Sequence, residues 1–174
     1  TVKEKTSVKN GKVYTVGAYK YKVTSVSKKT VTISGSKKKD IKKIVVPDTV
    51  KLGGVSYKVT AVGSNAFKNC KKATSVKVGK NVASIGKSGF YGCVKVKTVS
   101  LNSKKLKTID AKAFYNCKAL TKMTIKSTVL KKVGSKAFSK TSSKVTVKVP
   151  KKKKSAYKKL LRSKGLSKKA KITS

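Results

Sequence analysis

The chain has 174 residues, and its 47 lysine and arginine residues against 4 acidic residues give a formal net charge of +43. Its 37% hydrophobic content is enough for the modest core of one domain, or of one segment of a longer repeat array. There is no histidine and no run near the roughly 18 apolar residues of a membrane span, so metal ligation, a cofactor and membrane insertion are not expected.

The positive charge comes almost entirely from lysine. Arg162 is the only arginine, and the lysines are spread along the whole chain. Lysine lacks the planar fork with which arginine reads bases, so sequence-specific nucleic-acid binding is disfavoured. The charge instead predicts attraction to anionic partners, strongest at low salt.

Residues 1–45 have the pattern of a strand-rich N-terminal cap followed by a degenerate first coil. Apolar and polar residues alternate at 13–16, 19–23 and 31–33, and Gly17 and Gly35 stand at the predicted turns. Because the chain begins with Thr1 and no signal core follows, we expect any targeting segment to lie upstream or to have been removed.

Residues 46–150 contain a repeat. The only four phenylalanines, Phe67, Phe90, Phe114 and Phe138, recur every 23 or 24 residues. Aliphatic residues keep the same period five and eight positions before each phenylalanine, and again in pairs after it. Alternation within those pairs, as at Met123 and Ile125, predicts one short strand in each copy. Stacked copies would place like residues about 4.8 Å apart, so the repeat predicts a solenoid of about four regular coils.

Residues 151–174 change to a helical pattern. Ala156, Tyr157, Leu160 and Leu161 are expected on one helix face, and Gly165 is typical of a C-terminal stop. Terminal coils of repeat arrays expose apolar core, so this helix is predicted to cover the last coil.

Several of these segments together resemble the BspA-type leucine-rich repeats of bacterial surface proteins. They are the Ala-Phe-x-x-Cys segments, the unit from Val133 to Phe138 and strands such as Leu120 to Ile125, although Val, Ala or Met stands at several leucine positions. The resemblance implies a curved, right-handed solenoid of short parallel strands and secretion or display on the bacterial surface. It also implies adhesion to host matrix proteins or other cells. On this basis the chain would be a C-terminal fragment of a longer surface protein.

Cys70, Cys93 and Cys117 recur with the repeat period, which predicts one column of free thiols facing the core together with the four phenylalanines. Three cysteines without histidine or a close pair do not fit a zinc site. A disulfide between adjacent coils remains open, and it would leave one thiol free. Tyr91 and Tyr115, next to core phenylalanines, are expected to be partly exposed.

The outward positions of the predicted strands form the candidate binding surface. These residues should give a polar face on the inner curve of the solenoid: Ser75, Lys77, Thr98, Ser100, Lys122, Thr124, Thr146 and Lys148. The face lacks the aromatic and arginine residues of most binding hot spots, so any contact there should be weak and charge-assisted. Alternatively, threonine is there as a strand former and lysine as protection against aggregation.

A second candidate is the densest run of charge, at the start of the predicted helix. This basic cluster comprises Lys151, Lys152, Lys153, Lys154, Lys158, Lys159 and Arg162. It has the character of a site for acidic polymers or headgroups, but a solvated face of the capping helix is the favoured interpretation.

Three functions follow from these patterns. The first is a non-catalytic secreted or cell-surface adhesion module whose partners are an anionic cell-wall polymer, an acidic glycan or a host matrix protein. The second is a structural end segment of a longer solenoid with no binding role. The third is non-specific nucleic-acid binding, which net charge alone supports. No residue pattern of a catalytic site is present, and oligomeric state is not predicted.

Overall fold

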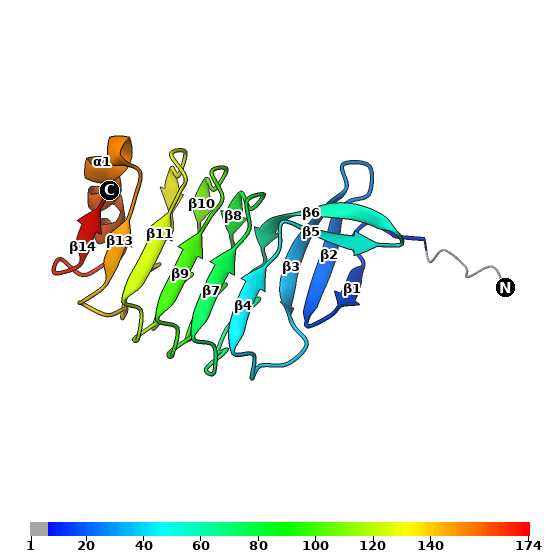
Figure 1. The fold of residues 1–174 in the computed structure, drawn as a ribbon, viewed down its shortest axis with the longest axis horizontal. Helices are drawn as coiled ribbons and strands as arrows, with labels where there is room; N and C mark the ends of the chain where they lie inside the picture. Colours follow the sequence, from blue (N-terminus) through cyan, green and yellow to red (C-terminus); the bar gives the residue numbers. More distant parts are fainter. Residues whose placement is uncertain (1–6) are drawn as a thin grey trace.

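The computed structural model describes residues 7–174 as a solenoid that runs from an N-terminal hairpin to a C-terminal helix (Figure 1). Two β-sheets form its walls. A six-stranded sheet contains β4 (Lys43–Val46), β7 (Ser75–Val78), β9 (Thr98–Leu101), β11 (Lys122–Ile125), β13 (Thr146–Lys148) and β14 (Lys171–Thr173). These strands stack in chain order, and every neighbouring pair is parallel.

The eight-stranded sheet joins the N-terminal cap to the coils. It contains β1 (Val13–Val16), β2 (Tyr19–Ser25), β3 (Thr30–Ser36), β5 (Thr49–Leu52), β6 (Val55–Val62), β8 (Ser84–Ile85), β10 (Thr108–Ile109) and β12 (Lys132–Val133). The predicted antiparallel cap is confirmed, because β1 pairs with β2 and β2 with β3 in antiparallel fashion. From β3 through β6 to β12 the main path is parallel, and β5 adds an antiparallel hairpin to β6. The first six residues of the predicted cap lie outside the described part.

The prediction of one strand in each copy was wrong, because a regular coil contributes one strand to each sheet. The second strands, such as β8 and β10, have only two residues. Alternation needs at least four residues to be recognised, so strands of this length leave no period-2 signal in the sequence.

The segment around each phenylalanine forms a third hydrogen-bond ladder between coils. The Phe67, Phe90 and Phe114 N–H groups donate at 2.8 Å to carbonyls of the following coil. Residues two before and two after each phenylalanine have φ between 54° and 70°: Asn65, Asn69, Ser88, Gly92, Lys112, Asn116, Lys136 and Lys140. This repeated left-handed geometry turns alternate N–H groups toward the next coil.

The core lies between the two sheets and this ladder. All four phenylalanine rings are buried and stack in one column, with centroids 5.2 to 5.6 Å apart. Tyr19 packs edge-on against the first of them, Phe67. Its hydroxyl also accepts from the Val45 N–H at 2.8 Å, which satisfies a backbone donor on the outer edge of β4.

The C-terminal segment closes the last coil at three places. It comprises a 3-10 turn, η1 (Lys151–Lys153), a helix, α1 (Lys154–Ser163), and β14, which extends the six-stranded sheet. Tyr157 of α1 is buried, and its hydroxyl accepts from Leu130 N–H at 3.0 Å and donates to the Ser127 carbonyl at 2.9 Å. The Lys164 carbonyl accepts from Phe138 N–H, so it continues the phenylalanine ladder.

The predicted helix is present, with one difference in its packed face. Tyr157 and Leu161 are buried and Leu160 is partly buried, but Ala156 is exposed. The spacing i, i+3, i+4 from Tyr157 defines the apolar stripe, and Ala156 lies outside it. The additional strand β14 was not predicted.

Candidate functional site

The outer face of the six-stranded sheet carries the eight residues of the candidate binding surface in two rows that cross the coils. Strand register places Lys43, Ser75, Thr98, Lys122, Thr146 and Lys171 in the first row. The second row contains Val45, Lys77, Ser100, Thr124, Lys148 and Thr173. No acidic residue stands in either row, and no two lysines face each other on neighbouring strands. We call these two rows the sheet face.

Four residues of the sheet face were missed in the sequence: Lys43, Val45, Lys171 and Thr173. The first two had a signal, because the run from Ile44 to Pro47 ends like the strands of the regular copies. The last two had none, since β14 contains a single apolar residue, Ile172.

The residues of the basic cluster at the start of α1 differ in their surroundings. Its lysines are exposed except Lys153, which is partly buried. Arg162 is also partly buried, and its guanidinium donates to the carbonyls of Lys168 at 2.8 Å and Ala170 at 3.4 Å. The single arginine therefore fastens the segment that leads into β14, and only the lysines remain as surface cations.

Tyr91 and Tyr115 form an aromatic pair beside the phenylalanine column. Both are partly buried, as expected, and their rings stack at 5.1 Å. Lys68 covers the ring of Tyr91 at 5.2 Å, and Lys140 covers that of Tyr115 at 5.4 Å. A hydrogen bond with Tyr115 raises the pKa of the Lys140 ammonium. Each ring therefore has one face against the other ring and a lysine over the ring as well. A ligand could reach the ring edges of this pair but could not stack on a ring face.

The three cysteines are buried free thiols in one column. Cys93 and Cys117 donate to the carbonyls of Phe67 and Phe90 at 3.2 and 3.3 Å. Burial raises the pKa of Cys93 to about 12 and raises that of Cys70 and Cys117 as well. Thiolate is the reactive form, so these groups are protected by both burial and protonation.

We therefore expect the folded protein to show no fast reaction with a thiol reagent at pH 8. After denaturation without reductant, three thiols per chain should react. A count of one would show that two of the cysteines are joined in a disulfide.

Surface charge is almost entirely unopposed. Among residues 7–174 the only ion pair joins Lys80 Nζ and Asp48 Oδ2 at 3.4 Å. The Lys80 backbone N–H donates to Asp48 Oδ1 at 2.7 Å, and this bond is the main reason that the pKa of Asp48 lies below its ordinary value. Within the same residues, no helix is long and apolar enough to cross a membrane, and no group of three or more acidic or cysteine side chains is placed to hold a metal ion.

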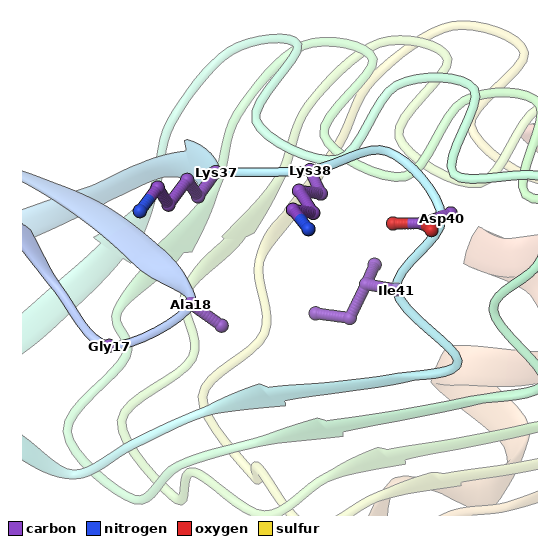
Figure 2. Close-up of a pocket in the computed structure, with 6 residues that line it drawn as sticks. All are labelled: Gly17, Ala18, Lys37, Lys38, Asp40 and Ile41. Atoms are coloured by element: carbon purple, nitrogen blue, oxygen red, sulfur yellow. The ribbon is translucent and has the colours of Figure 1, made fainter.

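A hollow of about 340 Å³ lies between the β1–β2 turn and the loop before β4 (Figure 2). Gly17 and Ala18 line it from the turn, and Lys38, Asp40 and Ile41 extend toward it from the loop. Asp40 is exposed and is the only carboxylate in the lining. One exposed acid beside lysines lacks the paired titratable groups of general acid–base catalysis.

Comparison with known proteins identifies the repeat. The family model described as the BspA type leucine rich repeat region matches residues 36–166 in six copies. No curated protein among those compared matches the chain.

Solved structures share the fold. A leucine-rich repeat protein from Bacteroides capillosus is 27% identical with a TM-score of 0.66, over 79% of this chain and 98% of that one. One from Bacteroides ovatus is 25% identical with a TM-score of 0.64, over 80% of this chain but 38% of that one. A leucine rich cell surface protein from Faecalibacterium prausnitzii, 24% identical with a TM-score of 0.58, has the same fold over 81% of this chain and 46% of its own length. With six repeat copies matched over most of its length, the chain belongs to the BspA-type leucine-rich-repeat family.

Proposed function

We propose that this chain is a non-catalytic interaction module of a secreted or cell-surface protein, and that its lysine-rich exterior engages anionic partners. The partner classes are an anionic cell-wall polymer, an acidic glycan or an acidic host matrix protein. A leucine-rich-repeat surface-protein fold is consistent with such a role.

The sheet face is the observation that carries the proposal. Lysine occupies five of its positions, at Lys43, Lys77, Lys122, Lys148 and Lys171, and Ser or Thr occupies all but one of the rest. The single ion pair of the described chain lies elsewhere, so none of these five ammonium groups is in an ion pair, although Lys77 is near enough to Asp48 to help lower the pKa of that carboxylate. Regular spacing across coils suits an extended partner with repeated negative charges.

A structural role is the second candidate. The chain spans 98% of the Bacteroides capillosus protein but only 38% of the Bacteroides ovatus protein and 46% of the Faecalibacterium protein, so solenoids with this fold can extend well beyond the length of this chain. The closing strand β14 and helix α1 support it too, since terminal repeats need such caps. This role predicts no saturable binding by the chain itself.

The test is a binding panel of wall polymer, sulfated glycan, DNA and acidic matrix protein. Each is measured at about 0.05 and 0.15 M salt, where the Debye length is about 14 and 8 Å. Saturable binding of one partner at the higher salt is the expected result. Loss of every anion together at 0.15 M salt would contradict the proposal and favour the structural role. DNA as the preferred ligand, with a steep salt dependence and no sequence preference, would favour non-specific nucleic-acid binding.

Two variants locate the contact. The face variant replaces Lys43, Lys77 and Lys122 by serine, and the cap variant replaces Lys22, Lys28 and Lys51, which are equally exposed but lie on the N-terminal cap and its neighbouring hairpin. Both remove three charges. The face variant should weaken binding a few-fold, because the face lacks hot-spot side chains, and the cap variant should leave it unchanged.

A further inference from the structure

The turns that follow β7, β9 and β11 carry a second basic surface at the carboxyl ends of the six-stranded sheet. These strands are parallel, so their following turns come to the same end of the sheet (Figure 1). Lys80, Asn81, Asn102, Lys104 and Lys105 line a hollow of about 370 Å³ between the first two turns. A second hollow of about 470 Å³ lies at the ends of β11 and β13, where Lys104, Lys126 and Lys148 line it.

Lys104 lines both hollows, so they lie next to each other along the coils, and together we call them the carboxyl-end groove. Its lysines come from four successive coils. At about 4.8 Å between parallel strands, three such steps extend roughly 14 Å along the solenoid. The groove is therefore long enough to contact several charges of one extended chain, and not only one small ion.

Charge in the groove is nearly uncompensated. Asp48 pairs with Lys80 at its first end, and the remaining lysines have no acidic partner among residues 7–174. Lys104, Lys105 and Lys126 are exposed, so a ligand can reach them. Their mutual repulsion falls when an anionic chain lies between them.

The turns beneath these lysines are held in place by buried serines. Ser103 donates to the Lys80 carbonyl at 2.9 Å and accepts from Lys105 N–H at 3.1 Å. Ser127, one coil further on, donates to the Leu106 carbonyl and accepts from Val129 N–H. Both serines are fully buried. The backbone that carries the cations is thus fixed before a ligand arrives, which lowers the entropy cost of binding.

The lining indicates which anion fits. It contains neither aromatic rings nor arginine. Without rings, bases have nothing to stack on, so DNA and RNA are disfavoured. Without the arginine fork, neither carboxylate nor phosphate can be held bidentately, so the lysines would bind the charges of a polymer as point charges, as lysine does with phosphate.

We propose that the carboxyl-end groove binds a flexible phosphodiester polymer without bases, such as a polyol phosphate, with the chain laid across successive coils. This inference rests on the proposed function and names the partner class and the surface. Lys104, Lys105 and Lys126 make the main contacts, and the sheet face contributes less.

The test uses a labelled poly(glycerol phosphate) oligomer and the whole chain at about 0.15 M salt. A groove variant, Lys104→Ser, Lys105→Ser and Lys126→Ser, is compared with the face and cap variants. We expect the groove variant to bind at least about tenfold more weakly, and its plot of log affinity against log salt to be shallower by about 2 to 3. The cap variant should match the wild type in both. Replacing the same three lysines by arginine keeps the charge and should retain binding, and equal melting temperatures exclude misfolding.

Several outcomes overturn the inference. One is a loss in the groove variant no larger than in the face variant. Another is equal binding of single-stranded DNA or of a sulfated glycan with the same number of charges, which removes the assignment of polymer class. A third is complete displacement of the labelled oligomer by inorganic phosphate at the same concentration of charge, which would show that the groove binds single anions and not a polymer. If the wild type binds no polymer of the panel at 0.15 M salt, the proposed function itself fails. If it binds one and the groove variant binds equally well, only the groove is wrong.

Discussion

Replacing Phe114 by alanine is expected to lower the free energy of unfolding by about 3 to 5 kcal/mol. The ring is fully buried and stacks between Phe90, at 5.2 Å, and Phe138, at 5.6 Å. Removing it opens a cavity between coils whose backbones are tied by N–H donors at 2.8 Å, so the neighbours have little freedom to collapse into the space.

Urea unfolding followed by circular dichroism measures this effect. Tyr115→Ala is the matched control, because it removes a neighbouring ring that is only partly buried, and it should cost about 1 kcal/mol. Coils contact only their neighbours, so a shallower or biphasic transition in Phe114→Ala would mean that the two halves unfold separately. A cost near 1 kcal/mol with an unchanged slope would show that the ring column is not the core that its burial indicates.

Replacing Gly134 by alanine is expected to cost about 3 kcal/mol, a large value for one methyl group. A β-carbon at Gly134 would overlap the backbone nitrogen of Ala111 and would stand 2.6 Å from the α-carbon of that residue. Gly134 N–H also donates to the Ile109 carbonyl at 2.8 Å, so making room for the methyl group stretches the bond between the two coils. The clashing atoms belong to the backbone, and they cannot rotate away from the new methyl group as a side chain could.

Gly63→Ala is the control, since Gly63 occupies the same column three coils earlier. There the nearest atoms to a β-carbon are the Ile33 carbonyl oxygen at 3.2 Å and a Thr32 methyl group at 3.3 Å. We expect a melting temperature close to that of the wild type for Gly63→Ala and a clear drop for Gly134→Ala. Similar melting temperatures would contradict the steric argument. Asp110 occupies the same repeat position as Gly63 and Gly134, so this position does not require glycine in every coil. The space between neighbouring coils decides which side chain is tolerated there.

Much of the fold was predictable because the repeat carries redundant signals. Phe67, Phe90, Phe114 and Phe138 mark the period, and the same columns recur as aliphatic pairs, so an error at one position is corrected by the other copies. The short strands β8, β10 and β12 were not predictable, since two residues show no alternation. Strand β14 was missed for a related reason: it pairs with β13 through backbone groups and contains one apolar residue.

The candidate sites, like the elements of the fold, were partly predictable from the sequence. The alternating strand positions placed eight residues of the sheet face correctly, because side-chain direction in a strand follows from the period of two. The carboxyl-end groove could not be recognised in the sequence. Its lysines Lys80, Lys104 and Lys126 lie in turns, and they do not stand at the same distance from the strands that precede them. The role of Arg162 was also hidden, because a sequence shows its charge but not the carbonyls to which it donates.

The sequence by itself determined the repeat period, the core columns including that of the cysteines, and the lysine-rich exterior. Each of these features depends on local pattern or on composition. Because similar units stack on one another, the pattern within one unit fixes the position of its residues in the whole solenoid. Tertiary structure alone decided which contacts close the ends: the hydrogen bond of the Tyr19 hydroxyl at β4, that of the Tyr157 hydroxyl at Leu130, and the pairing of β14 with β13. It also decided which lysines share a groove. Both depend on contacts between residues of different coils, and no single copy of the repeat contains them.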